Sequence, residues 1–208
     1  MNSHRFCYRI FAFLALFLIS LNPAMAGGAK NLAQYRKAVL DLCNQARTNP
    51  QKFAQDNLQM YKDDPQTTGG DNGSFDDLMS RKPAPALKMN THLNAAAQFI
   101  SQFMAEHNVF DHNADGRTPF QRLAKIGYQH RAAAENIAGL GCRYDNAEID
   151  PELAALNFVL QWIIDRDVQG VGHRENLLNP TFTEIGIGFW HNEKSDLQNY
   201  SAQEFGRP

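Results

Sequence analysis

The hydrophobic period of this chain changes near its C-terminus, and the change limits the folds open to it. Residues 31–48, 91–107 and 151–165 carry apolar side chains at spacings of three and four, which predicts amphipathic helices. Residues 184–190 and 199–205 are instead typical of two strands joined by a polar turn. Helices on both sides of a run of short strands favour a layered α+β domain.

Proline and glycine mark the ends of several of these helices. Pro50 ends the first one, because the residue before a proline disfavours the α region, and a second short helix is expected over 50–61. Thr118 and Pro119 begin another helix, which Gly127 closes.

One segment between the helices lacks a hydrophobic pattern. Residues 62–84 are rich in Asp and Gly and contain few apolar residues. Such a composition is typical of turns and loops. We therefore expect a surface insertion over 62–84, with one turn of helix at 75–79.

The N-terminus has the pattern of a secretory signal peptide. Two arginines precede an apolar run at 10–21, and an Ala-Met-Ala motif that ends at Ala26 follows it. The run is shorter than the about 20 residues that a spanning helix needs. We expect a signal peptide at 1–26, a secreted or periplasmic location, and no transmembrane segment in the mature chain. Residues 27–208 suit a single domain.

Charge and cysteine content narrow the classes of function. The formal net charge is −2, which provides no basic surface for nucleic acid or anionic membranes. The mature chain keeps Cys43 and Cys142 in a compartment where a disulfide persists once formed. Cys43 also falls on the apolar face of the first helix, which suits a buried thiol. A bridge and a free thiol both remain open.

Two segments resemble signatures of the CAP superfamily: 110–139, FDHNADGRTPFQRLAKIGYQHRAAAENIAG, and 172–178, GHRENLL. This superfamily comprises cysteine-rich secretory proteins, antigen 5 proteins, plant pathogenesis-related proteins and bacterial SCP-like extracellular proteins. The resemblance implies a three-layer α-β-α sandwich and covers nearly the whole mature chain except the expected insertion. Further matching positions are Asn44 and Arg47 in the opening helix, 85–87 as a first strand and 200–206 as the closing strand.

The resemblance also implies a shared cleft lined by His112, Glu135, Asp165 and His173. Some relatives hold a metal at these positions, and imidazole and carboxylate groups are good zinc ligands. His112 and His173 are therefore candidate ligands for a divalent metal such as zinc, although no local spacing fixes that geometry by itself. The alternative is that the same residues form hydrogen-bonded pairs that satisfy buried polar groups, with Glu135 tying a loop to His112.

Other charged residues near this cluster have structural interpretations. Asp165 follows Trp162 by three residues, so both can share a helix face, and its short carboxylate is expected to reach a metal less well. Arg122 is expected to be a surface or capping charge. For Arg174, the sequence leaves open a salt bridge to Glu175 or Asp165 and a role in substrate binding.

Several functions fit these observations. The chain has no G-x-S-x-G nucleophile elbow, which favours a secreted binding module that takes a lipid, an envelope component or a protein partner through the cleft. The alternative is a metal-assisted, protease-like hydrolase in which His112 and His173 hold the ion and Glu135 activates water. A purely structural envelope protein is the third possibility. Whether the chain is an enzyme stays open at this point.

We predict that processing occurs after Ala26. The exported protein should begin at Gly27, because small residues in this pattern mark the cleavage site. Intact-mass analysis of the exported protein measures this directly. A full-length product retained in the membrane would contradict the prediction.

Overall fold

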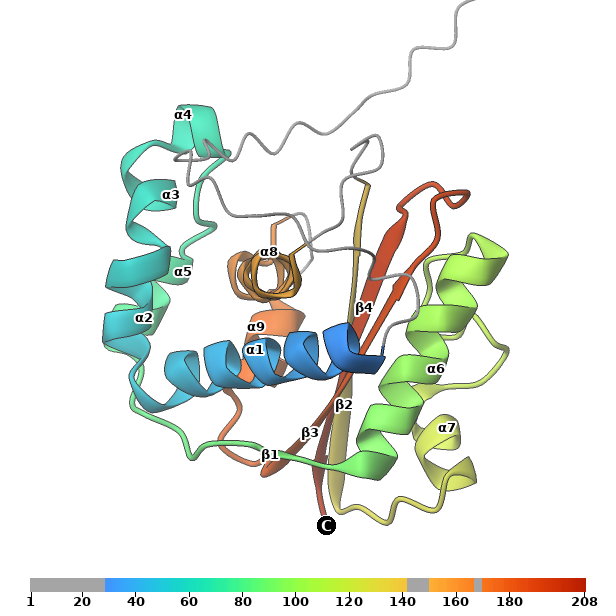
Figure 1. Cartoon of the computed structure of the whole chain (residues 1–208). Coiled ribbons are helices and arrows are strands. Elements are labelled where there is room, and N and C mark those ends of the chain that lie inside the picture. The colour runs from blue at the N-terminus through green and yellow to red at the C-terminus, as the bar shows by residue number, and fades with distance from the viewer. Residues whose placement is uncertain (1–28, 142–149, 167–169) are drawn as a thin grey trace, which may run out of the picture.

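The protein forms a four-stranded sheet covered by helices, as seen in a computed structural model (Figure 1). The structure describes residues 29–141, 150–166 and 170–208. The expected signal peptide at 1–26 and Cys142 lie outside these ranges. No helix within them is long and apolar enough to cross a bilayer.

The described part of the chain begins with five helices, and strands appear only from β1 onward. In order, the elements are α1 (Ala29–Thr48), α2 (Pro50–Asn57), α3 (Gln59–Asp63), α4 (Pro65–Thr68), α5 (Ser74–Ser80), β1 (Lys88–Met89), α6 (Thr91–His107), α7 (Pro119–Lys125), β2 (Ala132–Leu140), α8 (Pro151–Ile164), α9 (Gly172–Leu178), β3 (Glu184–His191) and β4 (Asn199–Arg207).

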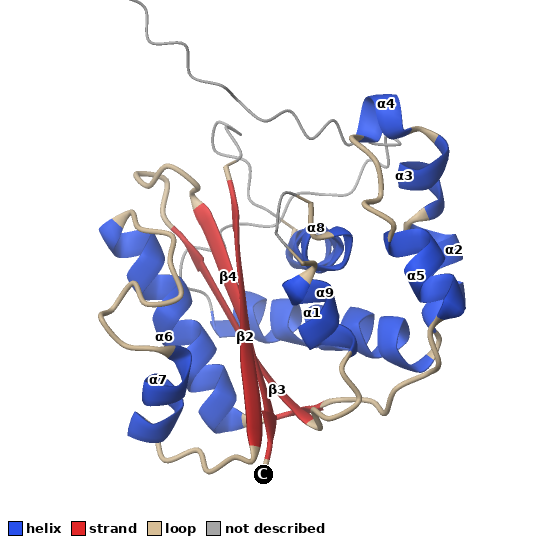
Figure 2. Cartoon of the chain, turned by 180° about the vertical axis from the view of Figure 1, so that it is seen from behind, coloured by secondary structure: helices blue, strands red, loops and turns tan. Residues whose placement is uncertain are grey.

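The strands lie in the order β1-β3-β4-β2, so β2 is at one edge of the sheet. β1 pairs with β3 in parallel, whereas β3 and β2 both pair with β4 in antiparallel fashion. Helices cover both faces, which gives three layers: α6 and α7 lie on one face, and α1, α8 and α9 on the other (Figure 2). This arrangement confirms the expected α+β, α-β-α sandwich.

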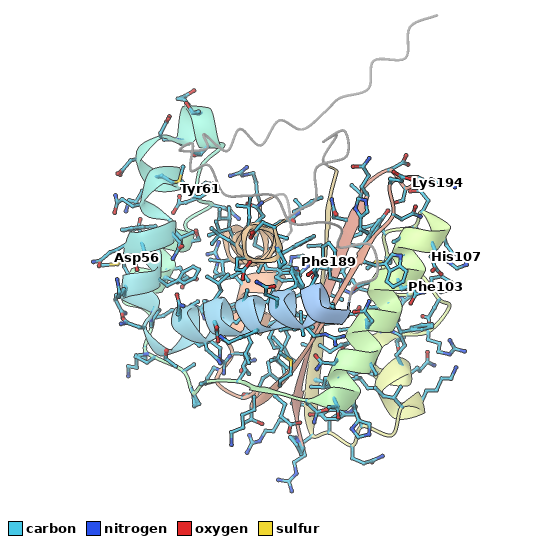
Figure 3. The ribbon with its side chains drawn as sticks, in the orientation of Figure 1. Asp56, Tyr61, Phe103, His107, Phe189 and Lys194 are labelled. Carbon is cyan, nitrogen blue, oxygen red and sulfur yellow. The ribbon has the colours of Figure 1, made fainter. Side chains whose placement is uncertain are left out.

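The larger core lies between the sheet and the pair α1 and α8. Ile185, Ile187 and Phe189 of β3 are buried there. The Phe189 ring, labelled in Figure 3, lies 4.8 Å from the Tyr35 ring of α1, centre to centre. A period of two along β3 thus places its large side chains on one face, as the sequence pattern predicted.

Two glycines of β3 let α6 lie directly on the opposite face. A Cβ atom at Gly186 would come within 1.9 Å of the carbonyl carbon of Leu93. One at Gly188 would come within 2.1 Å of the carbonyl oxygen of Ala97. Because both obstacles are backbone atoms, no side-chain rotation can relieve the clash. The two backbones are therefore in direct contact at these positions.

Arg47 holds the end of α1 to three other segments. Its buried guanidinium donates hydrogen bonds of 2.8–3.0 Å to four carbonyl oxygens, those of Pro85, Leu177, Asn179 and Phe182. Burial lowers the pKa of Arg47 to about 10, and the nearby Cys43 acts in the opposite direction. Four acceptors in a fixed arrangement suit the planar guanidinium and no other side chain.

The structure corrects several expectations about the elements. β2 and α9 were not predicted, and β2 occupies a region where a loop had been expected around Glu135. The first strand is β1, just after the expected 85–87. The helix expected over 50–61 is divided between α2 and α3, because Leu58 ends the first and precedes the second.

Part of the expected surface insertion at 62–84 packs against the core. Leu78 of α5 is fully buried, and the Asn72 side chain donates to the carbonyls of Ile164 and Asp165 at the end of α8. The second half of the segment is therefore attached to the domain, and only the first half lies mainly on the surface. Local composition missed this because the partners come from far along the chain.

Cys43 is a free thiol buried beneath β4. The side-chain amide of Gln203 lies 3.2 Å from its Sγ atom and donates to it. Burial raises the pKa of Cys43 to about 12, although the bond from Gln203 and the charge of Arg47 oppose this shift. Cys43 is therefore not bridged in this structure, and Cys142, its possible partner, lies outside the described residues.

We predict that Arg47→Lys lowers the free energy of unfolding by about 2–4 kcal/mol, because an ammonium group cannot reach four carbonyls in this geometry and leaves buried acceptors unpaired. Chemical denaturation measures the change. Arg131→Lys is the matched control, since Arg131 is exposed, and it should alter stability by less than about 0.5 kcal/mol. Equal effects of the two substitutions would contradict the role of Arg47.

Candidate functional site

The first histidine of the expected cluster is paired with a buried carboxylate. His112 Nδ1 lies 2.7 Å from Glu135 Oε1. The Glu135 side chain is 1% exposed, whereas that of His112 is 45% exposed. In a neutral imidazole with this partner, Nδ1 carries the proton and donates it, which leaves the Nε2 lone pair free. Glu135 therefore fixes the orientation of a histidine that faces solvent.

Arg122 of α7 holds this pair in place. It donates to Glu135 Oε2 and to the carbonyl of His112, the latter at 2.8 Å. A third bond of 3.0 Å joins it to Asp115. Burial disfavours the charged form of Asp115, but bonds from Arg117 and the charge of Arg122 outweigh it and lower the pKa of Asp115. Arg122 is buried, so the expectation of a surface or capping charge was wrong.

The second histidine has a similar partner. His173 Nδ1 lies 2.8 Å from Asp165 Oδ1, and the other carboxylate oxygen accepts the backbone N–H groups of His173 and Arg174 at 2.9 and 3.3 Å. The His173 side chain is 19% exposed and Asp165 is buried. The carboxylate of Asp165 is thus fully engaged in orienting His173 and the start of α9.

Asp165 reaches His173 because it lies just beyond α8. It occupies the C-cap position in the left-handed region, with φ 53°. The expectation that Asp165 shares a helix face with Trp162 was therefore wrong. Arg174 forms neither of the side-chain salt bridges that the sequence suggested. It is buried, and its guanidinium donates to carbonyls and to Asp77.

Edge strand β2 connects the two histidines. Glu135 points toward α7, and the next residue, Asn136, points toward α9, since successive side chains of a strand face opposite ways. The Asn136 amide donates to the carbonyl of His173 at 3.0 Å and accepts a bond of 2.9 Å from Asn176. The four predicted residues thus form two pairs. β2 contacts one pair through Glu135 and the other through Asn136, whose side chains point to opposite faces of the strand.

Glu204 is a buried acid that sequence reasoning missed. It lies opposite Glu135 in the register of β2 and β4 and is fully buried. Within the described part of the chain, neither of its carboxylate oxygens has a hydrogen-bond partner. Burial and the charge of Glu135 raise the pKa of Glu204 well above its usual range, with the charge of Arg122 acting against them. Burial therefore favours the protonated, neutral form of Glu204.

The arrangement differs from a preformed zinc site. Among the residues that the structure describes, no three His, Cys, Asp or Glu side chains converge as metal ligands do. His112 and His173 each use Nδ1 for a carboxylate, so only Nε2 of each is free to act as a ligand. Zinc binding through this pair stays a prediction.

Comparison with known proteins decides the family. The model of the cysteine-rich secretory protein family, CAP, matches residues 40–205. The chain belongs to the CAP family. A curated relative, the uncharacterized protein YkwD of Bacillus subtilis (strain 168), is 33% identical over 104 residues. That match covers 50% of this chain and 34% of YkwD.

Solved structures show the same CAP fold. An extracellular protein containing an SCP domain from Bacillus anthracis str. Ames aligns with a TM-score of 0.51 and 21% identity, over 85% of this chain and 41% of that one. BmVAL-1 aligns with a TM-score of 0.54 and 14% identity, over 88% of this chain and 81% of that one. The chain thus spans less than half the length of the two Bacillus proteins.

We predict that Glu204→Gln makes the stability of the domain less dependent on pH. The raised pKa means that the folded state of the wild type holds a proton that the unfolded state releases. The stabilisation is complete below the ordinary glutamate pKa and is lost as pH rises through the folded value. The variant should match the wild type near pH 4 and be the more stable of the two at alkaline pH.

Thermal melts across this pH range measure the difference. Glu193→Gln is the control, because Glu193 is exposed, and its curve should follow the wild type at every pH. A Glu204→Gln variant that is less stable than the wild type at alkaline pH would show that the carboxylate is ionised in the fold.

Proposed function

We propose that this CAP domain is a secreted binding module, and that its ligand is a lipid, an envelope component or a protein partner bound at the two histidine–carboxylate pairs. The observation that carries the proposal is the shared geometry of His112 and His173. Each donates through Nδ1 to a buried carboxylate, which leaves Nε2 to meet a ligand. Histidines fixed in this way present a hydrogen-bond acceptor with little loss of side-chain entropy on binding.

The nucleophilic side chains that the structure describes support binding over covalent catalysis. Ser101 donates to a carbonyl of its own helix, and Ser201 is buried against Tyr35. Cys43 is buried with a raised pKa, so it is protonated and inaccessible. None of the three lies beside a histidine that activates it.

The position of Glu135 supports the hydrolase alternative less well than it supports the binding module. A general base must reach the water that it activates. Both Glu135 oxygens are instead engaged, one by His112 and the other by Arg122, and the side chain is almost fully buried. Glu135 is thus better placed to orient His112 than to accept a proton from water.

We predict that His112→Ala and His173→Ala each weaken ligand binding about five- to tenfold, the effect of losing one hydrogen bond worth about 1 kcal/mol. The probes are purified peptidoglycan and vesicles of phosphatidylethanolamine and phosphatidylglycerol, with binding measured by co-sedimentation. The wild type should bind at least one of them. His92→Ala is the control, because His92 is an exposed histidine on α6.

Two results would count against this proposal. Equal binding by both site variants and the wild type would place the ligand elsewhere. Peptide hydrolysis that needs added zinc, and that Glu135→Gln abolishes, would favour the metal-assisted hydrolase.

A further inference from the structure

The outer edge of β3 is only partly covered by a strand. β1 pairs with Glu184 and Ile185, and the chain then turns into α6. Beyond that point Ile187 and Phe189 direct their N–H and C=O groups away from β4. A strand edge of this kind presents donors and acceptors at the spacing that another extended chain requires.

Side chains from two helices occupy those four groups. The Asn94 side chain accepts from the Ile187 N–H at 2.8 Å, and Arg36 Nε donates to the Ile187 carbonyl at 2.7 Å. Gln98 meets both groups of Phe189: it accepts from the N–H at 3.3 Å and donates to the carbonyl at 2.8 Å. The amide side chains thus repeat the bonding of a backbone strand.

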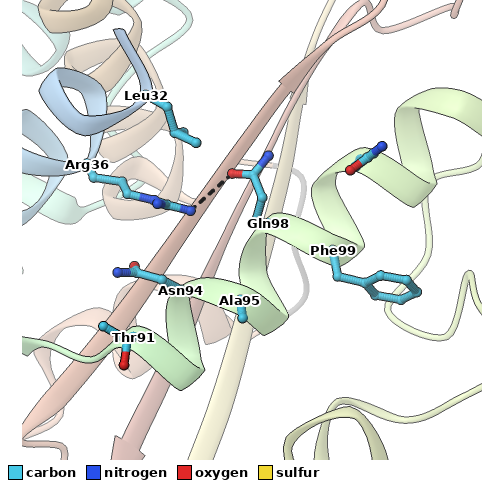
Figure 4. Close-up of a pocket in the computed structure, with 8 residues that line it drawn as sticks. Leu32, Arg36, Thr91, Asn94, Ala95, Gln98 and Phe99 are labelled. Carbon is cyan, nitrogen blue, oxygen red and sulfur yellow. Dashed lines mark hydrogen bonds between the residues drawn. The ribbon is translucent and has the colours of Figure 1, made fainter. Parts of the chain in front are cut away.

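A groove of about 550 Å³ lies along this edge, between α1 and α6 (Figure 4). Three of its lining residues, Arg36, Asn94 and Gln98, are the ones that cover β3, and Arg36 also donates to Gln98 across the groove at 3.2 Å. Leu32 and Phe99 add apolar surface, and Phe99 is 44% exposed. The groove therefore combines polar groups that face the edge of β3 with apolar groups on its walls.

We propose that this groove docks a short extended peptide segment of a partner protein, which pairs with β3 at Ile187 and Phe189 after Asn94, Gln98 and Arg36 rotate away. The incoming backbone would continue the line of β1 along the same edge, as in recognition by strand addition. Each bond to a side-chain amide is replaced by one to a backbone amide, so few hydrogen bonds are lost. Leu32 and Phe99 would contact alternate side chains of the peptide.

The chemistry of the groove favours a peptide over a lipid. A lipid chain offers no partners for the four backbone groups, whereas an extended peptide offers donors and acceptors at the matching spacing. Arg36 is the one charged residue among those that line the groove, and the other lining residues are neutral. This site lies at the edge of the sheet opposite β2. The proposal therefore does not depend on the histidine pairs.

The test uses a capped peptide of alternating threonine and valine and the same peptide N-methylated at alternate positions. We expect the first to shift the backbone amide signals of Ile187 and Phe189 in a titration followed by nuclear magnetic resonance, and to slow their hydrogen exchange. The N-methylated peptide should do neither, because it cannot donate to the strand. Equal binding of both peptides would overturn the proposal without the need for any variant.

A double variant, Asn94→Ala with Gln98→Ala, tests the displacement step. Removing the competing side chains should tighten binding of the peptide about tenfold, since these side chains no longer have to leave the edge of β3 before the peptide binds. Phe99→Ala should weaken peptide binding, because the substitution removes a wall of the groove.

Weaker binding by the double variant would show that the amides are direct ligand contacts. A double variant that dimerises and ignores the peptide would assign the edge to a second copy of the chain. Either result would overturn the proposal.

Discussion

Successive residues of a strand point to opposite faces of its sheet, and the candidate site of this CAP domain depends on that rule. Glu135 and Asn136 are neighbours in β2, yet one reaches His112 and the other reaches the backbone of His173. Because β2 is an edge strand, both contacts form at the border of the sheet, although Glu135 and Asn136 are themselves buried. A shift of one residue in the pairing of β2 with β4 would exchange the two faces, separate both contacts and remove Glu204 from its position opposite Glu135.

Buried guanidinium groups supply the second constraint. Arg122 holds the carbonyl of His112, and Arg174 holds that of Ile163, close to Asp165. Carbonyl groups in loops and at helix ends find no partner within a sheet or helix. When such a carbonyl is buried, another group must donate a hydrogen bond to it. One arginine provides several donors from a single side chain. Side chains from α7 and α9 therefore fix the loop that carries His112 and the end of α8 beside Asp165.

Much of the fold could be predicted from the sequence, because α1, α6, α8 and β3 bury regular runs of apolar side chains. β2 was missed since its AAAENIAGL sequence alternates little, and α9 since it has only seven residues. The pairing of His112 with Glu135 was among the predicted arrangements, but Glu204 was not. Its environment depends on strand register, which local sequence does not determine. The burial of Arg122 was missed for the same reason, because its acceptors come from a separate loop and strand.

The contact of α6 with Gly186 and Gly188 has a consequence for how this protein can vary. No layer of side chains lies between helix and strand there, so the helix cannot slide or tilt to absorb a change on its inner side. Its outer side has no such restriction, and there Phe103 and His107 stack at 3.9 Å, centre to centre (Figure 3). Evolution, or an engineer who grafts a new recognition sequence, can therefore alter the outer residues of α6 while the backbone that displays them keeps its place.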